Sequence, residues 1–203
     1  MEIDRKNHWE AVYETKQPNE VSWTQEIPKT SLDFINETQM GKSAKIIDVG
    51  GGDSKLVDFL LDQGYENITV LDISGKALER AKKRLGKNAE KVNWIVSDIA
   101  EFKPDISYDI WHDRATFHFL TTPEKLKTYV EITEKWVTNF LIIAAFSEKG
   151  PTKCSGLEIK QYSELELENQ FSNRFKKLKC VQEDHITPFE TSQNFTFCVF
   201  EKG

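Results

Sequence analysis

The sequence predicts an α/β protein built on a doubly wound, mainly parallel sheet. Three observations support this fold class. Short apolar runs alternate with helix-like patterns from residue 45 onward, the run at 140–146 is apolar throughout, and the last two runs have no helix between them. Alternating strands and helices are typical of a parallel sheet covered on both faces, whereas strands joined by a turn pair antiparallel. We therefore expect a seven-stranded sheet whose last strand is antiparallel.

Two strand-turn-helix units open the sheet. The strand Lys45–Val49 is followed by a glycine-rich turn and a helix pattern that stops near Gly64, which is a typical residue after a helix C-terminus. The second strand is Ile68–Leu71, and Ser74 is expected to cap the helix that follows it. The repeat of this unit predicts neighbouring parallel strands.

Three more strands are expected in the middle of the chain, at Val92–Val96, Tyr108–Trp111 and Phe140–Phe146. Because Phe140–Phe146 carries apolar residues on both faces, we expect it in the middle of the sheet. The pattern Thr121-x-x-Glu124 is a capping box and predicts the start of the helix between the last two of these strands.

The C-terminal part is expected to end in a hairpin. A second capping box, Ser163-x-x-Glu166, predicts one more helix. The strands Lys177–Glu183 and Phe195–Glu201 follow, separated only by a turn-rich segment, so they should pair antiparallel. The sequence therefore divides into an N-terminal segment, residues 1–44, and a sheet domain, residues 45–203.

Composition excludes several classes of protein. The chain has 203 residues, 38% of them hydrophobic, and a net charge of −6, which indicates one packed domain without the positive field of a nucleic-acid or membrane binder. No apolar stretch is long enough for a signal peptide or a membrane span, so we expect a cytoplasmic protein. We also expect a monomer. Cys154, Cys180 and Cys198 lack metal-binding spacing and are expected to be reduced. No metal site is expected.

Acidic residues end three of the predicted strands. Asp48, Asp72 and Asp98 stand at or just after the first, second and third strands. Ligands of open α/β sheets bind at the carboxyl ends of strands, and an acid after the second strand can accept both hydroxyls of a ribose. The glycine-rich turn after the first strand, residues 50–52, would bring backbone N–H groups to the same ligand. These residues together predict a nucleoside pocket.

The type of nucleoside follows from two details. Lys55 occupies the position of the third glycine in a dinucleotide fingerprint, which disfavours NAD. Asp48 lies beside the expected ligand and suits a cationic one. An NAD-dependent oxidoreductase and a non-catalytic nucleoside-binding module stay open as alternatives.

The stretch Ile46-Ile-Asp-Val-Gly-Gly-Gly-Asp-Ser, the acid Asp72 and the segment Ser97-Asp98-Ile99 resemble the cofactor motifs of class I S-adenosylmethionine-dependent methyltransferases, which have a Rossmann-like fold. The resemblance implies that Asp72 binds the ribose, Asp98 the adenine amino group, and the residues near Asp48 the methionine part. The full set of implied cofactor residues is Trp23, Asp48, Val49, Gly50, Gly51, Gly52, Asp72, Ile73, Asp98, Ile99 and His112.

A further resemblance concerns the N-terminal segment. Trp9-Glu-x-x-Tyr13 and Ser22-Trp23 are similar to a segment that folds over the cofactor in a subgroup containing protein-lysine methyltransferases. It implies that residues 1–44 form a helical lid and that residues 45–203 form the catalytic domain. The alternative is that Trp9 and Trp23 only pack between helices.

The candidate catalytic residues follow the fourth strand. Because this strand should lie beside the first, we expect His112, Asp113 and Arg114, with His118 one turn later, to face the reacting group. His112 or Asp113 would act as the base when the acceptor carries a proton. The alternatives are that Asp113 and Arg114 pair with each other or cap backbone, and that His118 lies in the core.

The methyl acceptor is expected to be a protein side chain or a small molecule. The Asn/Asp-Pro-Pro element of enzymes that methylate nucleic-acid bases is absent, and the net charge of −6 also disfavours nucleic acid. His112-Asp113-Arg114 departs from the acidic-Lys-Gly sequence of the lysine-methylating subgroup, which disfavours a lysine acceptor. The segments Lys149–Tyr162 and His185–Phe189 are expected to complete the acceptor pocket.

Overall fold

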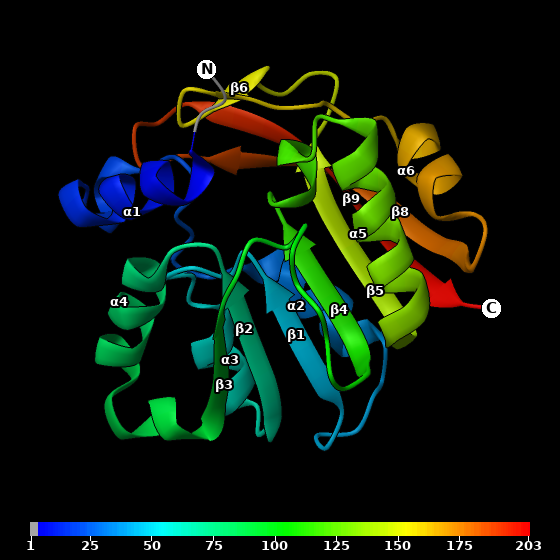
Figure 1. Cartoon of the computed structure of the whole chain (residues 1–203), viewed down its shortest axis with the longest axis horizontal. Helices are drawn as coiled ribbons and strands as arrows, with labels where there is room; N and C mark the ends of the chain where they lie inside the picture. The colour runs from blue at the N-terminus through cyan, green and yellow to red at the C-terminus, as the bar shows by residue number, and fades with distance from the viewer. Residues whose placement is uncertain (1–3) are drawn as a thin grey trace.

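The computed structural model describes residues 4–203 and contains one seven-stranded sheet in the order β3-β2-β1-β4-β5-β9-β8 (Figure 1). The first five strands run parallel, and β9 enters antiparallel between β5 and β8. The predicted fold class is confirmed. The strands are β1 (Lys45–Val49), β2 (Asn67–Asp72), β3 (Val92–Val96), β4 (Tyr108–Arg114), β5 (Val137–Phe146), β8 (Phe175–Ile186) and β9 (Ser192–Lys202).

The middle of the sheet is occupied by β4, not by β5 as expected. An apolar run indicates that a strand is covered on both faces, and every interior strand of a parallel sheet meets this condition. The run therefore could not single out the central strand. In the observed order β4 lies directly beside β1, as predicted, so that strand order reverses between them.

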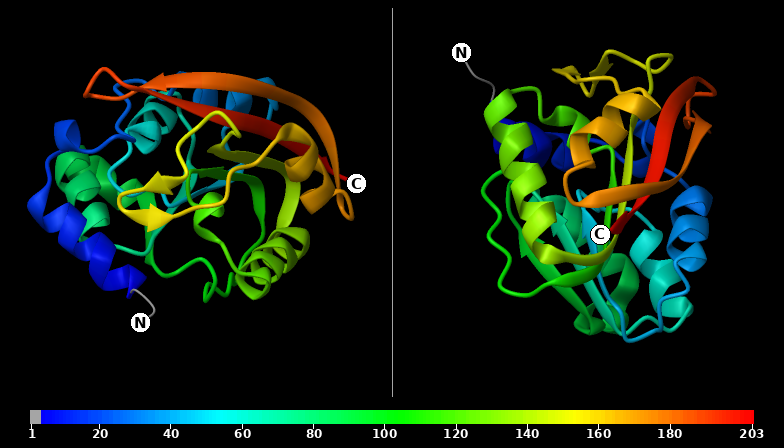
Figure 2. Two further views of the ribbon diagram at one scale, coloured as in Figure 1. Left: turned by 90° about the horizontal axis from the view of Figure 1, so that it is seen from above. Right: turned by 90° about the vertical axis from the view of Figure 1, so that its right-hand side faces the viewer.

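Helices cover both faces of the sheet (Figures 1 and 2). The residues of α2, α3 and α4 pack in one apolar cluster with Ile46, and those of α5 and α6 pack in a second cluster with Ile47. Since successive residues of a strand point to opposite faces, this alternation separates the two layers. The helices are α1 (Arg5–Thr15), α2 (Lys29–Glu37), α3 (Leu56–Asp62), α4 (Gly75–Leu85), α5 (Pro123–Trp136) and α6 (Glu164–Phe171).

Helix starts agree with the sequence at two places and differ at one. Ser74 caps α4, and Ser163 forms the predicted capping box with Glu166 at α6. The start of α5 lies one residue later than predicted, because Thr122 is the N-cap and its hydroxyl accepts from the amide of Lys125. Pro123 then occupies the first helical position, where its missing N–H costs nothing.

Shorter elements sit near the carboxyl edge of the sheet. Figure 1 shows α1 and the β6 region above this edge, and Figure 2 shows the same region from above. Helix α1 packs against α4, and Arg80 Nη2 donates to the carbonyl of Lys16 just after α1 (2.6 Å); residues 1–3 of the predicted N-terminal segment lie outside the described residues. The short elements are η1 (Pro18–Glu20), η2 (Gly86–Lys91), η3 (Phe117–Phe119), β6 (Lys153–Cys154) and β7 (Leu157–Glu158).

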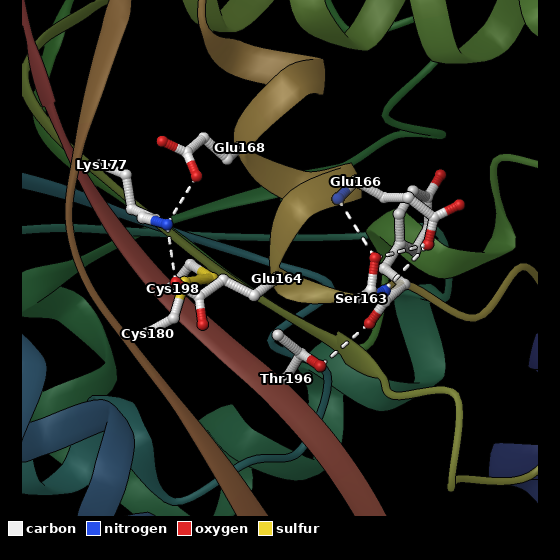
Figure 3. Close-up of a disulfide and its surroundings, with 9 residues drawn as sticks. Ser163, Glu164, Glu166, Glu168, Lys177, Cys180, Thr196 and Cys198 are labelled. Carbon is white, nitrogen blue, oxygen red and sulfur yellow. Dashed lines mark hydrogen bonds and ion pairs between the residues drawn. A yellow bond between two sulfur atoms is a disulfide. The ribbon is translucent and has the colours of Figure 1, made fainter.

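One expectation about cysteines is wrong. Cys180 and Cys198 form a disulfide between β8 and β9, and Cys154 is free and buried (Figure 3). The two bonded residues are register partners, and their Cα atoms are 4.1 Å apart. The expectation of reduced thiols rested on cellular compartment and cysteine count, and neither shows which residues a hairpin brings face to face.

A buried polar chain fixes the end of β4 against α5. The Tyr129 hydroxyl donates to Asp113 Oδ2 (2.7 Å) and accepts from Trp111 Nε1 (3.0 Å). Asp113 Oδ1 accepts from the amides of Thr116 (2.9 Å) and Phe117 (3.0 Å). Because these amides belong to the turn that leaves β4, the carboxylate sets the direction of the turn. Burial raises the pKa of Asp113 to about 6.

We expect Tyr129→Phe to lower the free energy of unfolding by about 1–3 kcal/mol, because it leaves a buried acceptor and a buried donor without a partner. Because the pKa of Asp113 is raised from 3.8 to about 6, folding free energy is lost as pH rises from the lower to the higher of these values, and the Tyr129 hydroxyl offsets part of that loss. The loss should therefore be larger at pH 7.5 than at pH 5.

Urea denaturation at the two pH values measures this effect. Tyr162→Phe is the matched control, since the Tyr162 ring is fully buried but its hydroxyl has no hydrogen-bond partner among residues 4–203. Equal losses for both variants would show that the polar chain does not support the turn.

Candidate active site

A cavity of about 410 Å³ opens at the carboxyl edge of the sheet. Its volume is typical of a site for a small ligand or cofactor. The ends of β1, β2, β3 and β4 form its floor, and residues of α1, the segment 18–31 and β6 form its walls. This is the position at which open α/β sheets bind ligands, beside the point where strand order reverses.

Three of the carboxylates that line this cavity stand at the ends of successive strands. They are Asp48, Asp72 and Asp98, the residues predicted from the sequence. Asp72 is 6% exposed, and its Oδ1 accepts from the amide of Ser74 at 2.8 Å. Burial, together with the nearby charges of Asp53 and Asp48, raises the pKa of Asp72 to about 7. The floor therefore presents a buried acid that ionises close to neutral pH.

The glycine-rich turn does not present the N–H groups of Gly50 and Gly51 to a ligand, contrary to the expectation. The amides of Gly50 and Gly51 both donate to the carbonyl of Leu71 (2.7 and 3.2 Å), so they are not available to a ligand. Glycine is required here for space. A Cβ on Gly50, whose φ is +67°, would lie 1.6 Å from Thr116 Oγ1, and one on Gly52 would lie 2.7 Å from Tyr13 Oη.

Two of the predicted cofactor residues do not line the cavity. Val49 is fully buried in the apolar layer under α5, and Gly52 lies beneath Tyr13 and Asp72. The other predicted cofactor residues do line it, including Ile73 and Ile99 near the carboxylates of the floor. These two apolar side chains suit a flat ring.

Aromatic side chains close the cavity from the N-terminal side. The rings of Trp9 and Trp23 lie 5.5 Å apart, and Trp9 also contacts Phe119 at 5.4 Å. Tyr13 lies 6.2 Å from Trp23, and all four rings line the cavity. The two tryptophans also pack on the apolar core. Each therefore both packs between helices and lines the cavity.

Glu10 anchors this aromatic cover to the floor. Its carboxylate accepts from the amides of Gly75 (2.8 Å) and Lys76 (3.1 Å) and from the Ser74 hydroxyl (3.0 Å), all at the start of α4. These hydrogen bonds lower the pKa of Glu10 against the opposing effect of burial. Because α4 begins just after Asp72, the anchor ties α1 to the acid on the floor.

His112 lies in a buried polar chain at the end of β4. Its Nδ1 is 2.7 Å from Asp48 Oδ1, and its Nε2 is 2.9 Å from Ser31 Oγ. The register of β1 and β4 pairs Asp48 with His112, and Ser31 comes from α2. With Nδ1 donating to the carboxylate, Nε2 accepts from the hydroxyl. Both ring nitrogens are therefore engaged.

Arg114 follows at the wall of the cavity. Its Nη1 donates to the carbonyl of Trp23 (3.2 Å), and its guanidinium lies 4.6 Å from the ring centre of Phe195. Burial lowers the pKa of Arg114 to about 10, so the group stays cationic at neutral pH. The alternative in which Arg114 pairs with Asp113 does not apply, since adjacent residues of a strand point to opposite faces.

Asp113 and His118 lie outside the cavity, so this geometry does not support a catalytic role for either. Asp113 faces α5 and holds the turn described above. His118 is fully buried, and its Nδ1 accepts from the amide of Phe146 (3.3 Å). Burial lowers the pKa of His118 to about 3, so it is neutral. The alternative interpretation of each, as a cap and as a core residue, agrees with these positions.

Sequence reasoning missed several lining residues. Arg5 and Ser31 lie outside the motifs of the sequence, and only their tertiary position brings them to the cavity. Of the two segments expected to complete the pocket, the first contributes Cys154, whereas no residue of His185–Phe189 lines it. His185 Nε2 instead donates to the carbonyl of Ser22 (2.7 Å) and supports the wall.

Comparison with known proteins agrees with this site. A family model described as a methyltransferase domain matches residues 46–135. The chain is 29% identical over 89 residues to the eEF1A lysine and N-terminal methyltransferase of Bos taurus, covering 43% of this chain and 13% of that protein. It is 28% identical to malonyl-[acyl-carrier protein] O-methyltransferase 1 of Ilyobacter polytropus, over 76% of this chain and 53% of that protein.

A solved methyltransferase structure matches the whole fold of this chain. The S-adenosylmethionine-dependent methyltransferase from Anabaena variabilis superposes with a TM-score of 0.77 at 14% identity, covering 100% of this chain and 96% of that chain. This chain is therefore similar to methyltransferases in sequence over residues 46–135, and it has the fold of a class I methyltransferase. The methyltransferase family predicted from the sequence is confirmed, together with its cofactor, S-adenosylmethionine.

The residues of this methyltransferase fit that cofactor. Asp72 places a buried carboxylate where ribose hydroxyls can donate to it, and a Cβ on Gly52 would come within 3.2 Å of its Oδ2. Nothing in the comparisons favours the NAD-dependent oxidoreductase. Residues 4–203 contain no cluster of ligands for a metal ion and no helix long and apolar enough to cross a membrane.

Nucleoside binding by this methyltransferase should strengthen as pH rises through about 7. The ionised form of Asp72 accepts ribose hydroxyls better than the protonated form, and its pKa is about 7. If the ionised form alone binds, the affinity rises about tenfold between pH 6 and pH 8. Calorimetric titration with S-adenosylhomocysteine measures this. Asp72→Asn should bind weakly with no such step; a step of the same size in the variant would assign the titration to another group.

The anchor of the cover gives a second prediction. We expect Glu10→Ala to weaken S-adenosylhomocysteine binding about three- to tenfold, because α1 loses three hydrogen bonds to the start of α4. Glu14→Ala is the matched control, since Glu14 lies on the same helix and pairs only with exposed Lys76. Equal affinities for the two variants would show that the cover does not contribute to binding.

Proposed function

We propose that this protein transfers the methyl group of S-adenosylmethionine to a nucleophilic acceptor, either a protein side chain or a small molecule. One observation carries the proposal. Asp48, Asp72 and Asp98 line a single cavity that an aromatic cover closes. The chain spans 13% of the bovine relative and 53% of the bacterial one, so the reaction and its acceptor rest on this site.

The floor of the cavity suits the cofactor. S-adenosylmethionine supplies, when bound, a methyl group activated by a cationic sulfur. The carboxylate of Asp72 would accept the ribose hydroxyls, and Asp98 would accept the adenine amino group. Ile73 and Ile99 would contact the faces of the adenine. Asp48 adds negative charge near the cationic part.

The aromatic cover, consisting of Trp9, Tyr13, Trp23 and Phe119, would exclude water from the reacting atoms. Methyl transfer is a displacement that needs the acceptor in line with the activated methyl group, so positioning supplies much of the acceleration. We propose that residues 1–44 act as the lid and residues 45–203 as the catalytic domain. This division follows from the side chains of α1 that line the cavity.

A proton leaves the site through the buried chain at β4. Both nitrogens of His112 are engaged, so a methyl acceptor would contact this series of hydrogen bonds through Ser31 Oγ. An acceptor that loses a proton would give it to Ser31 Oγ while the Ser31 proton passes to His112 Nε2. Asp48 stabilises the resulting imidazolium. We assign Ser31 and His112 as the base in this form.

The acceptor class, the oligomeric state and the location of the protein stay predictions. The net charge of −6 supports acceptors other than nucleic acid. We also propose a monomer, as predicted from the sequence. The cytoplasmic location predicted from the sequence also remains a proposal.

Calorimetry tests the proposal directly. We expect S-adenosylhomocysteine to bind, and Asp72→Ala to weaken the binding by at least about a hundredfold, since the ribose loses a charged acceptor. Binding of NADH without a response to S-adenosylhomocysteine would refute the proposal.

A transfer assay separates the enzyme from a binding module. Cell lysate incubated with the protein and radiolabelled S-adenosylmethionine should gain label in either the protein or the small-molecule fraction, and Asp72→Ala should not support this gain. Cofactor binding without transfer to either fraction would indicate the non-catalytic module.

A further inference from the structure

Positive charge without a matching acid gathers at the β4 end of the cavity. Arg114 ends β4, and the guanidinium carbon of Arg5 lies 5.7 Å from the ring centre of Phe119, in the segment after β4; both arginines line the cavity. Asp48, on the strand beside β4, is engaged by His112. The cations on the opposite side of the cavity have partners, since Lys55 pairs with Glu26 and Arg84 with Asp58. The two ends of the cavity therefore differ in charge.

Arg114 is the centre of this charge. Its Nη1 donates to the Trp23 carbonyl, but its Nε and Nη2 are buried and have no hydrogen-bond partner among residues 4–203. A buried donor without an acceptor costs about 1–3 kcal/mol, and more when it is charged. Such a group in a cavity wall indicates an acceptor that a ligand brings.

No neighbouring side chain of residues 4–203 satisfies Arg114. Glu183 influences its pKa but forms no ion pair with it, and Glu183 Oε2 is itself without a partner. Burial raises the pKa of Cys154 to about 12, so this thiol is neutral. Burial also lowers the pKa values of His118 and His185. The guanidinium of Arg114 therefore forms no ion pair within residues 4–203.

We propose that Arg114 binds an anionic oxygen group, such as a carboxylate, on the methyl acceptor, with Arg5 adding positive charge at the same wall. The inference rests on the proposed function and specifies its substrate class. A guanidinium matches two oxygens of a carboxylate in its plane, whereas an ammonium would be repelled by both arginines. The acceptor is an acid, or carries one next to its nucleophilic atom.

The position of Arg114 favours the acceptor over the cofactor as the source of the anion. The residues that suit the nucleoside lie on β1, β2 and β3, and Arg114 lies on β4, beyond Asp48. The methionine part of the cofactor also carries a carboxylate, so the experiment must distinguish these two sources.

The first measurement titrates the complex of the protein with S-adenosylhomocysteine. We expect malonate to bind in a saturable way, n-butylammonium to show no binding, and Arg114→Met to weaken malonate binding at least tenfold. Arg114→Lys, which keeps the charge but loses the planar donor pair, should fall between the two. Arg174→Met is the control outside the cavity and should match the wild type.

Glu183→Gln tests the remaining internal partner. Removing this negative charge should leave malonate binding unchanged or strengthen it, because Arg114 then faces less competition. Weaker malonate binding in this variant, or binding of n-butylammonium in place of malonate by the wild type, overturns the inference.

The second measurement identifies the source of the anion. S-adenosylhomocysteine and 5′-methylthioadenosine, which lacks the amino-acid part, are titrated into wild type and Arg114→Met. Equal affinities of both proteins for S-adenosylhomocysteine support the acceptor. A tenfold loss for S-adenosylhomocysteine alone assigns Arg114 to the cofactor carboxylate and overturns the inference while the proposed function stands. No binding of S-adenosylhomocysteine to the wild type overturns the proposed function itself.

Discussion

The register between β1 and β4 determines most of the site. This parallel pairing sets Asp48 beside His112 on one face of the sheet. It sets Val49 beside Asp113 on the other face. On one face His112 joins Asp48 and Ser31, and on the other Asp113 joins Tyr129. A shift of the register by one residue would reverse every one of these orientations.

The same alternation divides the segment after β4 by role. His112 and Arg114 point toward the cavity, whereas Asp113 between them points toward α5 and holds the turn. Of these three consecutive ionisable residues, two line the cavity and one stabilises the turn. The support matters to the binding side, because the turn that Asp113 fixes carries Thr116, which lies against Gly50.

The sequence allowed the fold and the floor of the cavity to be predicted, because both depend on local patterns. Strand ends mark where Asp48, Asp72 and Asp98 stand, and parallel pairing brings such ends together. The direction of a side chain at the irregular end of a strand is not local, so Asp113 and His118 could not be separated from His112. Ser31 and the pairing of Cys180 with Cys198 depend on contacts distant in sequence.

The carbonyl of Trp23 accepts its hydrogen bond from Arg114, so one guanidinium touches both the aromatic cover and the open wall of the cavity. If the aromatic cover acts as the proposed lid, exchange of ligands would move Trp9 and Trp23 aside, which is a local opening far smaller than unfolding. An anion held by Arg114 orients the same group that holds Trp23. If Arg114 binds the acceptor as proposed, occupancy of the cavity and closure over it would be coupled through this one side chain.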